Sequence, residues 1–127
     1  STEIAHQKGI ELKIVLCELK KDLINANLLI AHNIDFDYPI LNCEFKRLNI
    51  KSGLNKLSKF CTMKANEICL FCNFGRDGKK WPKLQELHIK LFNKSFSNAH
   101  SAIVDAEITA KCFLELKRRN IIAISTY

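Results

Sequence analysis

The stretch Leu28-Leu-Ile-Ala-His-Asn-Ile-Asp-Phe-Asp-Tyr-Pro-Ile-Leu-Asn-Cys-Glu-Phe45 decides the fold that the sequence predicts. Its apolar run, residues 28–31, has the length of a buried strand, and the turn-prone pair His32-Asn33 ends it. Pro39 suits the first turn of a helix, where its missing N–H breaks no hydrogen bond. Helical spacing continues at Tyr38, Leu41, Phe45 and Leu48. The stretch therefore predicts a strand, a tight polar turn and a helix, with the Asp37 carboxylate at the junction.

Asp37 has two interpretations on this stretch alone. It is either an ordinary helix cap beside a turn, or part of a functional site, because open α/β sheets place their chemistry where strand ends meet helix starts. A second stretch, His100-Ser-Ala-Ile-Val-Asp105, opens the last long helix that the sequence predicts. The pair of stretches favours the functional interpretation.

Together the two stretches resemble the second and third motifs of the DEDDh 3'-5' exonucleases. That family includes the proofreading epsilon subunit of bacterial DNA polymerase III, ribonuclease T and oligoribonuclease. The pattern His-Asn-x-x-Phe-Asp is matched by His32, Asn33, Phe36 and Asp37, and the pattern His-x4-Asp by His100 and Asp105. The resemblance extends from residue 10 to residue 119. It implies an α/β fold, the C-terminal, helix-rich portion of a ribonuclease H-like exonuclease domain, and a DNA proofreading or repair type of activity on nucleic-acid 3' ends.

The resemblance also implies a role for each matched residue. Asp37 and Asp105 would bind metal and His100 would be the general base, since an imidazole exchanges protons near neutral pH. His32, Asn33 and Phe36 would shape the turn and the substrate pocket. Two divalent ions, Mg²⁺ or Mn²⁺, are expected, because hard ions prefer clustered carboxylates and assist phosphodiester hydrolysis. Asp35 competes with Asp37, but the family pattern places the acid directly after the Phe.

One motif of the family, an Asp-x-Glu on an opening strand, has no match in this chain. Residues 1–9 contain one acid, Glu3, and no strand-like run. Asp105-Ala-Glu107 is no substitute, because two residues along a helix project to opposite faces. We expect the first three strands of the fold to be missing as well, which makes the chain part of an exonuclease domain and inactive by itself. The alternative is a catalytically inactive nucleic-acid-binding or scaffold module.

Length and composition fit one globular domain spanning residues 1–127, at 47% hydrophobic residues. Twenty basic and thirteen acidic residues give a net charge of +7, which favours a polyanionic partner. We expect single-stranded 3' ends of nucleic acid, and a DNA polymerase is a further candidate. The predicted strand lacks strands to pair with, so an exposed sheet edge would favour a homodimer. No apolar run approaches the ~20 residues of a membrane span, and a cytoplasmic protein is expected.

Six cysteines raise the question of a zinc site. Cys69 and Cys72 have ligand spacing and Cys61 is a third candidate ligand, so a zinc-stabilised interaction domain is the last alternative. The other three fall in helical patterns, where a free thiol behaves as a small apolar group: Cys17, Cys43 and Cys112. Reduced thiols are expected in a cytosolic protein.

The rest of the chain predicts mainly helices. A short helix or frayed end at residues 1–8 is followed by Gly9 and then by a helix with an apolar stripe. That stripe consists of Leu12, Val15, Leu16, Leu19 and Leu23. Further elements are a strand at 59–62, a short helix within 63–72, a helix at 84–92 and a last helix from 98–101 to 119.

The segment between residues 74 and 82 is predicted to be an exposed loop, because it holds two Gly, a Pro and three basic residues. Its cations suit contacts with phosphates. Its ring, Trp81, is expected to pack into the core beside the next helix rather than to stack on a base.

Overall fold

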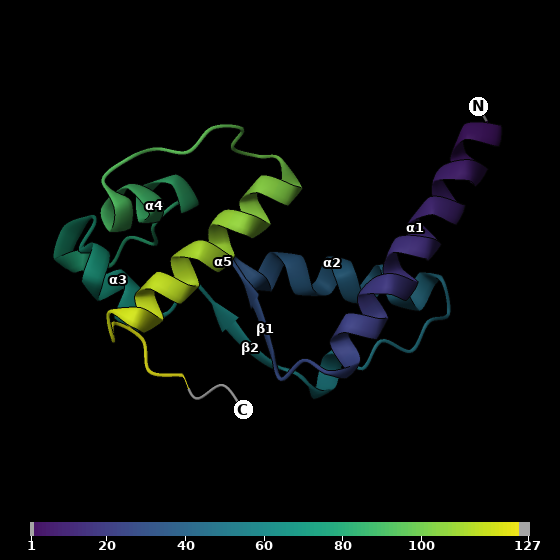
Figure 1. Cartoon of the computed structure of the whole chain (residues 1–127), viewed down its shortest axis with the longest axis horizontal. Coiled ribbons are helices and arrows are strands. Elements are labelled where there is room, and N and C mark those ends of the chain that lie inside the picture. Colours follow the sequence, from purple (N-terminus) through teal and green to yellow (C-terminus); the bar gives the residue numbers. More distant parts are fainter. Residues whose placement is uncertain (1, 125–127) are drawn as a thin grey trace. The chain divides into compact units, whose positions relative to one another are not determined.

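The computed structural model describes the backbone of residues 2–124 and the side chains of residues 11–124. These residues form five α-helices, two strands and two short 3-10 turns, shown in Figure 1. Their bounds are α1 Thr2–Ile24, β1 Leu28–Ala31, α2 Ile34–Arg47, η1 Leu54–Lys56, β2 Ser58–Cys61, α3 Asn66–Cys72, η2 Arg76–Gly78, α4 Leu84–Phe92 and α5 Ala102–Arg118. No helix in this part of the chain is long and apolar enough to cross a membrane.

The two strands run parallel and pair with each other. The Ser58 N–H donates to the Asn27 carbonyl at one end, and the Thr62 N–H donates to the Ala31 carbonyl at the other. Around them the chain divides into two compact units, each of which is described by itself. Unit 1 comprises residues 1–29 and 36–58, and unit 2 comprises residues 30–35 and 59–127.

Unit 1 has a small apolar core between α1, α2 and η1. Leu16 and Leu23 of α1 are buried against Phe45 of α2 and Leu54 of η1. The predicted apolar stripe is confirmed at these α1 positions, whereas Val15 is 60% exposed and lies outside it. The predicted interruption near Gly9 was wrong, because α1 is continuous from Thr2.

The start of α2 differs from the prediction. The helix begins at Ile34, directly after the turn formed by His32 and Asn33, and Asn33 has a left-handed φ of 76°. Asp37 is therefore in the first turn of the helix rather than at the junction. Pro39 is inside the helix, where its missing N–H removes the hydrogen bond to the Asp35 carbonyl.

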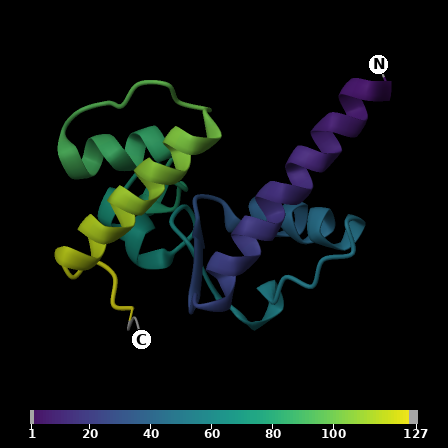
Figure 2. The same ribbon diagram turned by 45° about the vertical axis from the view of Figure 1, so that its right-hand side comes forward.

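Unit 2 is built on α4 and α5, which lie side by side (Figure 2). Its core is made of buried residues from three helices and the segment after α5: Ile68, Cys72, Leu87, Leu91, Cys112, Leu116 and Ile122. The Phe60 ring of β2 contacts the Phe113 ring of α5 edge to face, with centroids 5.6 Å apart. The predicted strand and the predicted helices of this region are confirmed, with shifts of a few residues at their ends.

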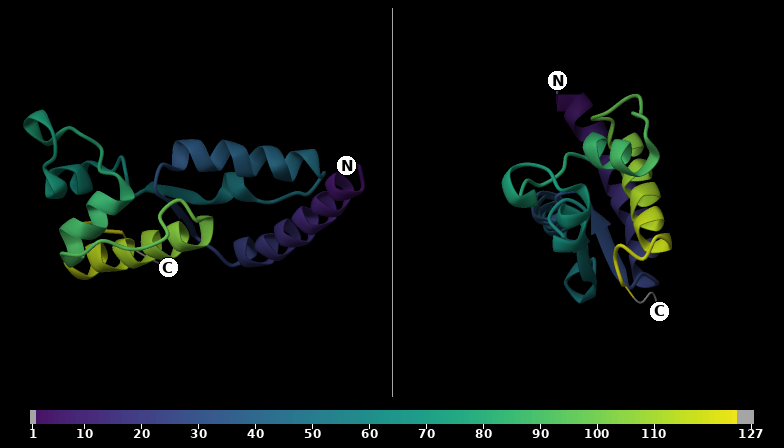
Figure 3. Two further views of the ribbon diagram at one scale, coloured as in Figure 1. Left: turned by 90° about the horizontal axis from the view of Figure 1, so that it is seen from above. Right: turned by 90° about the vertical axis from the view of Figure 1, so that its left-hand side faces the viewer.

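The segment between α3 and α4 is irregular apart from η2, as predicted, and both views of Figure 3 display it. The expectation that Trp81 packs into the core was wrong. Its side chain is 53% exposed. The neighbouring Pro82 is fully buried instead, so the proline rather than the indole anchors the segment.

Candidate functional site

The turn after β1 is held by the side chain of His32. Nδ1 lies 2.8 Å from the Thr62 hydroxyl, and Nε2 lies 2.9 Å from the Pro82 carbonyl oxygen. A carbonyl only accepts hydrogen bonds, so Nε2 donates to it. In the neutral ring Nδ1 is an acceptor, and at 2.8 Å it is nearer to the Thr62 hydroxyl than the competing Ala31 carbonyl, at 3.4 Å. His32 thus connects the ends of the two strands with the segment before α4.

The surroundings of His32 favour the neutral form of its imidazole. Burial lowers the pKa of His32 below its ordinary value of 6.5, and the Pro82 carbonyl and the nearby charge of Asp105 oppose that effect. Both ring nitrogens already have partners within unit 2. His32 is therefore suited to fixing the turn rather than to carrying a proton in a reaction.

A second group forms at the start of α5. His100 has a left-handed φ of 74°, and its backbone N–H donates to Oδ1 of Asp105 over 3.2 Å. The Asp105 N–H in turn donates to the Ser101 carbonyl over 2.8 Å. The carboxylate lies in the first turn of the helix, where the positive end of the helix dipole stabilises a negative charge. The His100 side chain is exposed, and Asp105 is half-buried.

The helix face beneath Asp105 is apolar. Below the carboxylate, Thr109, Cys112 and Leu116 are buried, whereas Glu107 is exposed on another face. This agrees with the sequence-based separation of Asp105 from Glu107. The half-buried Asp105 carboxylate therefore lies at the N-terminal end of a row of buried side chains along α5.

Asp37 and Phe36 belong to unit 1, on the first turn of α2. Phe36 is 62% exposed. Asp37 is also exposed, yet partial burial of its carboxylate raises the pKa of Asp37 above 3.8. Of the six residues predicted for the site, His32, Asn33, His100 and Asp105 belong to unit 2.

Comparison with known families identifies the protein class. A family model described as an exonuclease, of the RNase T type, matches residues 6–113. The chain belongs to this exonuclease family. Comparisons with curated proteins and with solved structures found no match. The mixed α/β architecture is consistent with part of a ribonuclease H-like exonuclease domain, and membership supports a nuclease activity on nucleic acid.

Exonuclease domains of this family generally use divalent metal ions. Among the residues that the structure describes, no three His, Cys, Asp or Glu side chains form a group that could hold one. The described carboxylates therefore do not by themselves make a two-ion site. Two of the three thiols suggested as zinc ligands, those of Cys69 and Cys72, are buried. Burial raises the pKa of Cys69 and raises that of Cys72 to about 11, which opposes the loss of the thiol protons that zinc binding requires.

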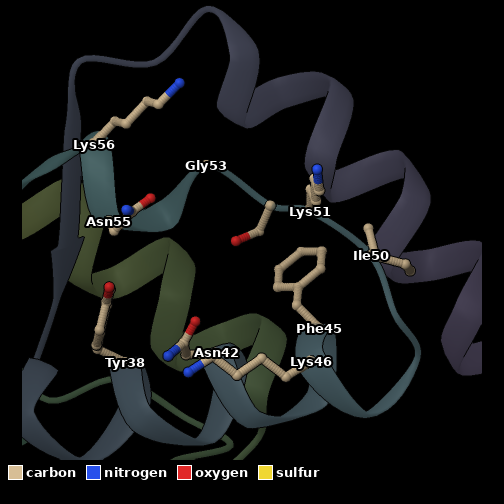
Figure 4. Close-up of a pocket in the computed structure, with 10 residues that line it drawn as sticks. Tyr38, Asn42, Phe45, Lys46, Ile50, Lys51, Gly53, Asn55 and Lys56 are labelled. Atoms are coloured by element: carbon tan, nitrogen blue, oxygen red, sulfur yellow. The ribbon is translucent and has the colours of Figure 1, made fainter.

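Unit 1 of the exonuclease chain contains an open pocket of about 480 Å³, drawn in Figure 4. Phe45 points toward it from α2. Three lysines and no acid line it: Lys46, Lys51 and Lys56. None of the residues predicted for the site is in its wall, so this pocket is separate from the motif residues.

The sequence analysis missed the two hydrogen-bond partners of the His32 ring, Thr62 and Pro82. Thr62 directly follows β2 just as His32 follows β1, and parallel strands end at the same edge of a sheet. That placement was a usable signal for Thr62. The Pro82 carbonyl is a backbone group fifty residues from His32, and no local sequence pattern indicates it.

Proposed function

We propose that this chain carries part of the active site of a DEDDh-type 3'-5' exonuclease, similar to the proofreading epsilon subunit. In this proposal His100 is the general base, and Asp37 and Asp105 contribute to metal binding. His32, Asn33 and Phe36 shape the turn and the substrate pocket. The observation that carries the proposal is the hydrogen-bonded pair of His100 and Asp105 at the start of α5, within the residues that the exonuclease family model matches.

The proposed reaction is hydrolysis of the last phosphodiester bond of a single strand. Water attacks the phosphorus, the bond to the 3' oxygen of the preceding nucleotide breaks, and a nucleoside 5'-monophosphate leaves. The exposed imidazole of His100 would take the proton from the attacking water. The Asp105 carboxylate fixes the backbone that carries this imidazole, because its Oδ1 accepts the His100 N–H.

Divalent ions, Mg²⁺ or Mn²⁺, neutralise phosphate oxygens and activate water in reactions of this class. Asp37 and Asp105 are two of the four acids in the DEDDh pattern. The other two would come from an Asp-x-Glu outside the motifs found in residues 28–105. The proposal therefore assigns weak or no turnover to these 127 residues alone.

The test compares the 127-residue chain with the same chain extended by the codons upstream of Ser1. Each protein is incubated with Mn²⁺ and a single strand labelled at its 3' or 5' end, as DNA and as RNA. The extended protein should release labelled mononucleotide at once from the 3'-labelled strand. It should shorten the 5'-labelled strand stepwise. An extended protein that contains an Asp-x-Glu and cleaves neither strand would contradict the proposal.

A catalytically inactive nucleic-acid-binding module is the second candidate. It is favoured by the net charge of +7 together with the lack of a three-ligand group among the described residues. Binding of single strands without cleavage by the extended protein would support it.

The proposal also includes partners. The described sheet has two strands, so each strand has an edge that other strands are able to pair with. A homodimer through such an edge, or association with a DNA polymerase, would cover it. Light scattering at high protein concentration tests the homodimer, and a clean monomer would contradict it.

A further inference from the structure

Trp81 is the only tryptophan of the chain, and it is exposed although its backbone is fixed. Its side chain is 53% exposed, whereas the next residue, Pro82, is fully buried. More than half of the indole surface is therefore accessible to a ligand, on a segment that the buried proline anchors.

A lysine holds the ring in place. The Lys64 ammonium lies 4.6 Å from the centroid of the Trp81 ring, within the range of a cation–π contact. The same ammonium lies 2.7 Å from the Asp35 carboxylate, and only 27% of the lysine side chain is exposed. The cation–π contact and the buried Pro82 that follows in sequence favour one position of the indole, which lowers the entropy lost when a ligand binds.

The ring is adjacent to the candidate site in unit 2. The Pro82 carbonyl accepts the hydrogen bond from His32 Nε2, and Asp105 is close enough for its charge to act on His32. Trp81 is thus one residue from the connection that fixes the turn after β1. A ligand group on the indole would lie next to the segment that His32 holds.

The chain around Trp81 is strongly basic. Between residues 76 and 83 four cations accompany a single acid, Asp77: Arg76, Lys79, Lys80 and Lys83. Lys80 also pairs with Glu86, at 3.2 Å. Such cations attract phosphates and repel basic peptides, so the charge favours a polyanion over a protein partner.

We propose that Trp81, positioned by Lys64, is a base-stacking subsite that binds one nucleobase of a single-stranded nucleic acid. The exposed indole surface takes the face of the base, and the surrounding cations contact the neighbouring phosphates. The inference rests on the proposed function in that the bound strand is the nuclease substrate. In this role Trp81 binds the base and positions the bound strand.

The single tryptophan provides the readout, because all indole fluorescence comes from Trp81. The 127-residue chain is titrated at fixed salt, without metal, with a ten-nucleotide thymidine oligomer and with an abasic oligomer of equal length. Stacking should quench the fluorescence with the thymidine oligomer and not with the abasic one. The dissociation constant should be lower for the thymidine oligomer.

Three variants sharpen the test, with binding measured by fluorescence anisotropy of a dye on the oligomer. Trp81→Ala should weaken binding of the thymidine oligomer by about 5- to 150-fold, which corresponds to the worth of one stacked base. It should leave abasic binding unchanged. Trp81→Phe should retain most of the affinity, because a phenyl ring also stacks. Leu70→Ala, which removes an exposed apolar side chain on α3, is the matched control and should change neither affinity.

The outcomes separate this inference from the proposed function. Thymidine binding without quenching, or equal affinity of Trp81→Ala and the unaltered chain, would overturn the subsite and leave the nuclease proposal intact. Quenching with loss of affinity in Trp81→Ala would support the subsite even if the extended protein cleaves nothing. Failure to bind either oligomer would overturn the subsite, whereas the cleavage assay alone decides the nuclease proposal.

Discussion

The turns that precede α2 and α5 have the same spacing of a histidine and an aspartate but different contacts. In each turn a histidine is followed five residues later by an aspartate, at His32–Asp37 and His100–Asp105. Each aspartate is the fourth residue of its helix, and a residue with left-handed φ closes each turn, Asn33 in one and His100 in the other.

The two imidazoles nevertheless have opposite surroundings. Both nitrogens of His32 are hydrogen-bonded, and burial lowers its pKa. The His100 ring is exposed, and the bond that fixes this residue uses its backbone N–H rather than its ring. The difference teaches that the spacing of the motif places both aspartates in the first turn of a helix, whereas the contacts of each ring decide whether its nitrogens are open to solvent.

The largest expected effect is a loss of nuclease activity, which we expect when His100 is replaced. In the extended protein, His100→Ala should lower the rate of 3'-nucleotide release by roughly 10²–10⁴-fold, the usual worth of a positioned general base. His100→Gly should lose as much activity. It should nevertheless be more stable than His100→Ala by about 1 kcal/mol, because alanine is strained at a φ of 74° and glycine is not. Equal rates for His100→Ala and the unaltered protein would contradict a catalytic His100.

The next effect is on stability. His32→Ala removes both ring hydrogen bonds, so the Pro82 carbonyl loses its histidine donor and the Thr62 hydroxyl keeps the longer contact with the Ala31 carbonyl, at 3.4 Å. We expect the free energy of unfolding to fall by about 1–3 kcal/mol, measured by urea denaturation. Thr62→Val should remove part of the same stability, so the double variant should lose less than the sum of both. Additive losses would show that the two side chains do not interact.

A smaller effect is expected from pH. Since burial lowers the pKa of folded His32 below 6.5, the unfolded chain binds a proton more readily than the folded one. The stability from neutral His32 is complete above pH 6.5 and is lost as the pH falls from there to the folded pKa. His32→Gln should remove this part of the pH dependence in denaturation curves taken between pH 5 and 8. An unchanged pH dependence in His32→Gln would show that His32 is not responsible.

The smallest effect is expected at Asp35, the acid that competes with Asp37. Its carboxylate pairs with Lys64 at the surface, and such exposed ion pairs contribute little. Asp35→Asn should change the unfolding free energy by less than about 0.5 kcal/mol and leave nuclease activity within about twofold. A loss as large as that of His100→Ala would show that Asp35 rather than Asp37 belongs to the reactive group.

Local patterns predicted much of the fold. The strand and turn at residues 28–33 and the two helices α4 and α5 followed from apolar spacing. The prediction that the first helix is interrupted near Gly9 was wrong. A glycine inside a helix destabilises it by only about 1 kcal/mol, which the rest of α1 is able to offset. The sequence does not indicate the early start of α2, because a proline favours the first turn of a helix and Pro39 is the sixth residue of α2.

The candidate site was harder to predict. The resemblance to the exonuclease motif His-x4-Asp indicated His100 and Asp105 as a pair. The prediction that Trp81 packs into the core was wrong, because composition does not reveal that the following proline is the buried residue of this segment. The contacts of His32 with Thr62 and Pro82 join residues 30 and 50 positions apart, so only the folded chain brings them together.

The most direct test of the account compares two substitutions on α5. Asp105→Asn keeps an oxygen that accepts the His100 N–H but removes the negative charge, and Glu107→Gln makes the same chemical change on an exposed face. The measurement is the initial rate of mononucleotide release from a 3'-labelled single strand by the extended protein with Mn²⁺. The account predicts a loss of at least about 10²-fold for Asp105→Asn and a rate within about twofold of the unaltered protein for Glu107→Gln. Equal rates for the two variants would contradict a catalytic centre at the start of α5.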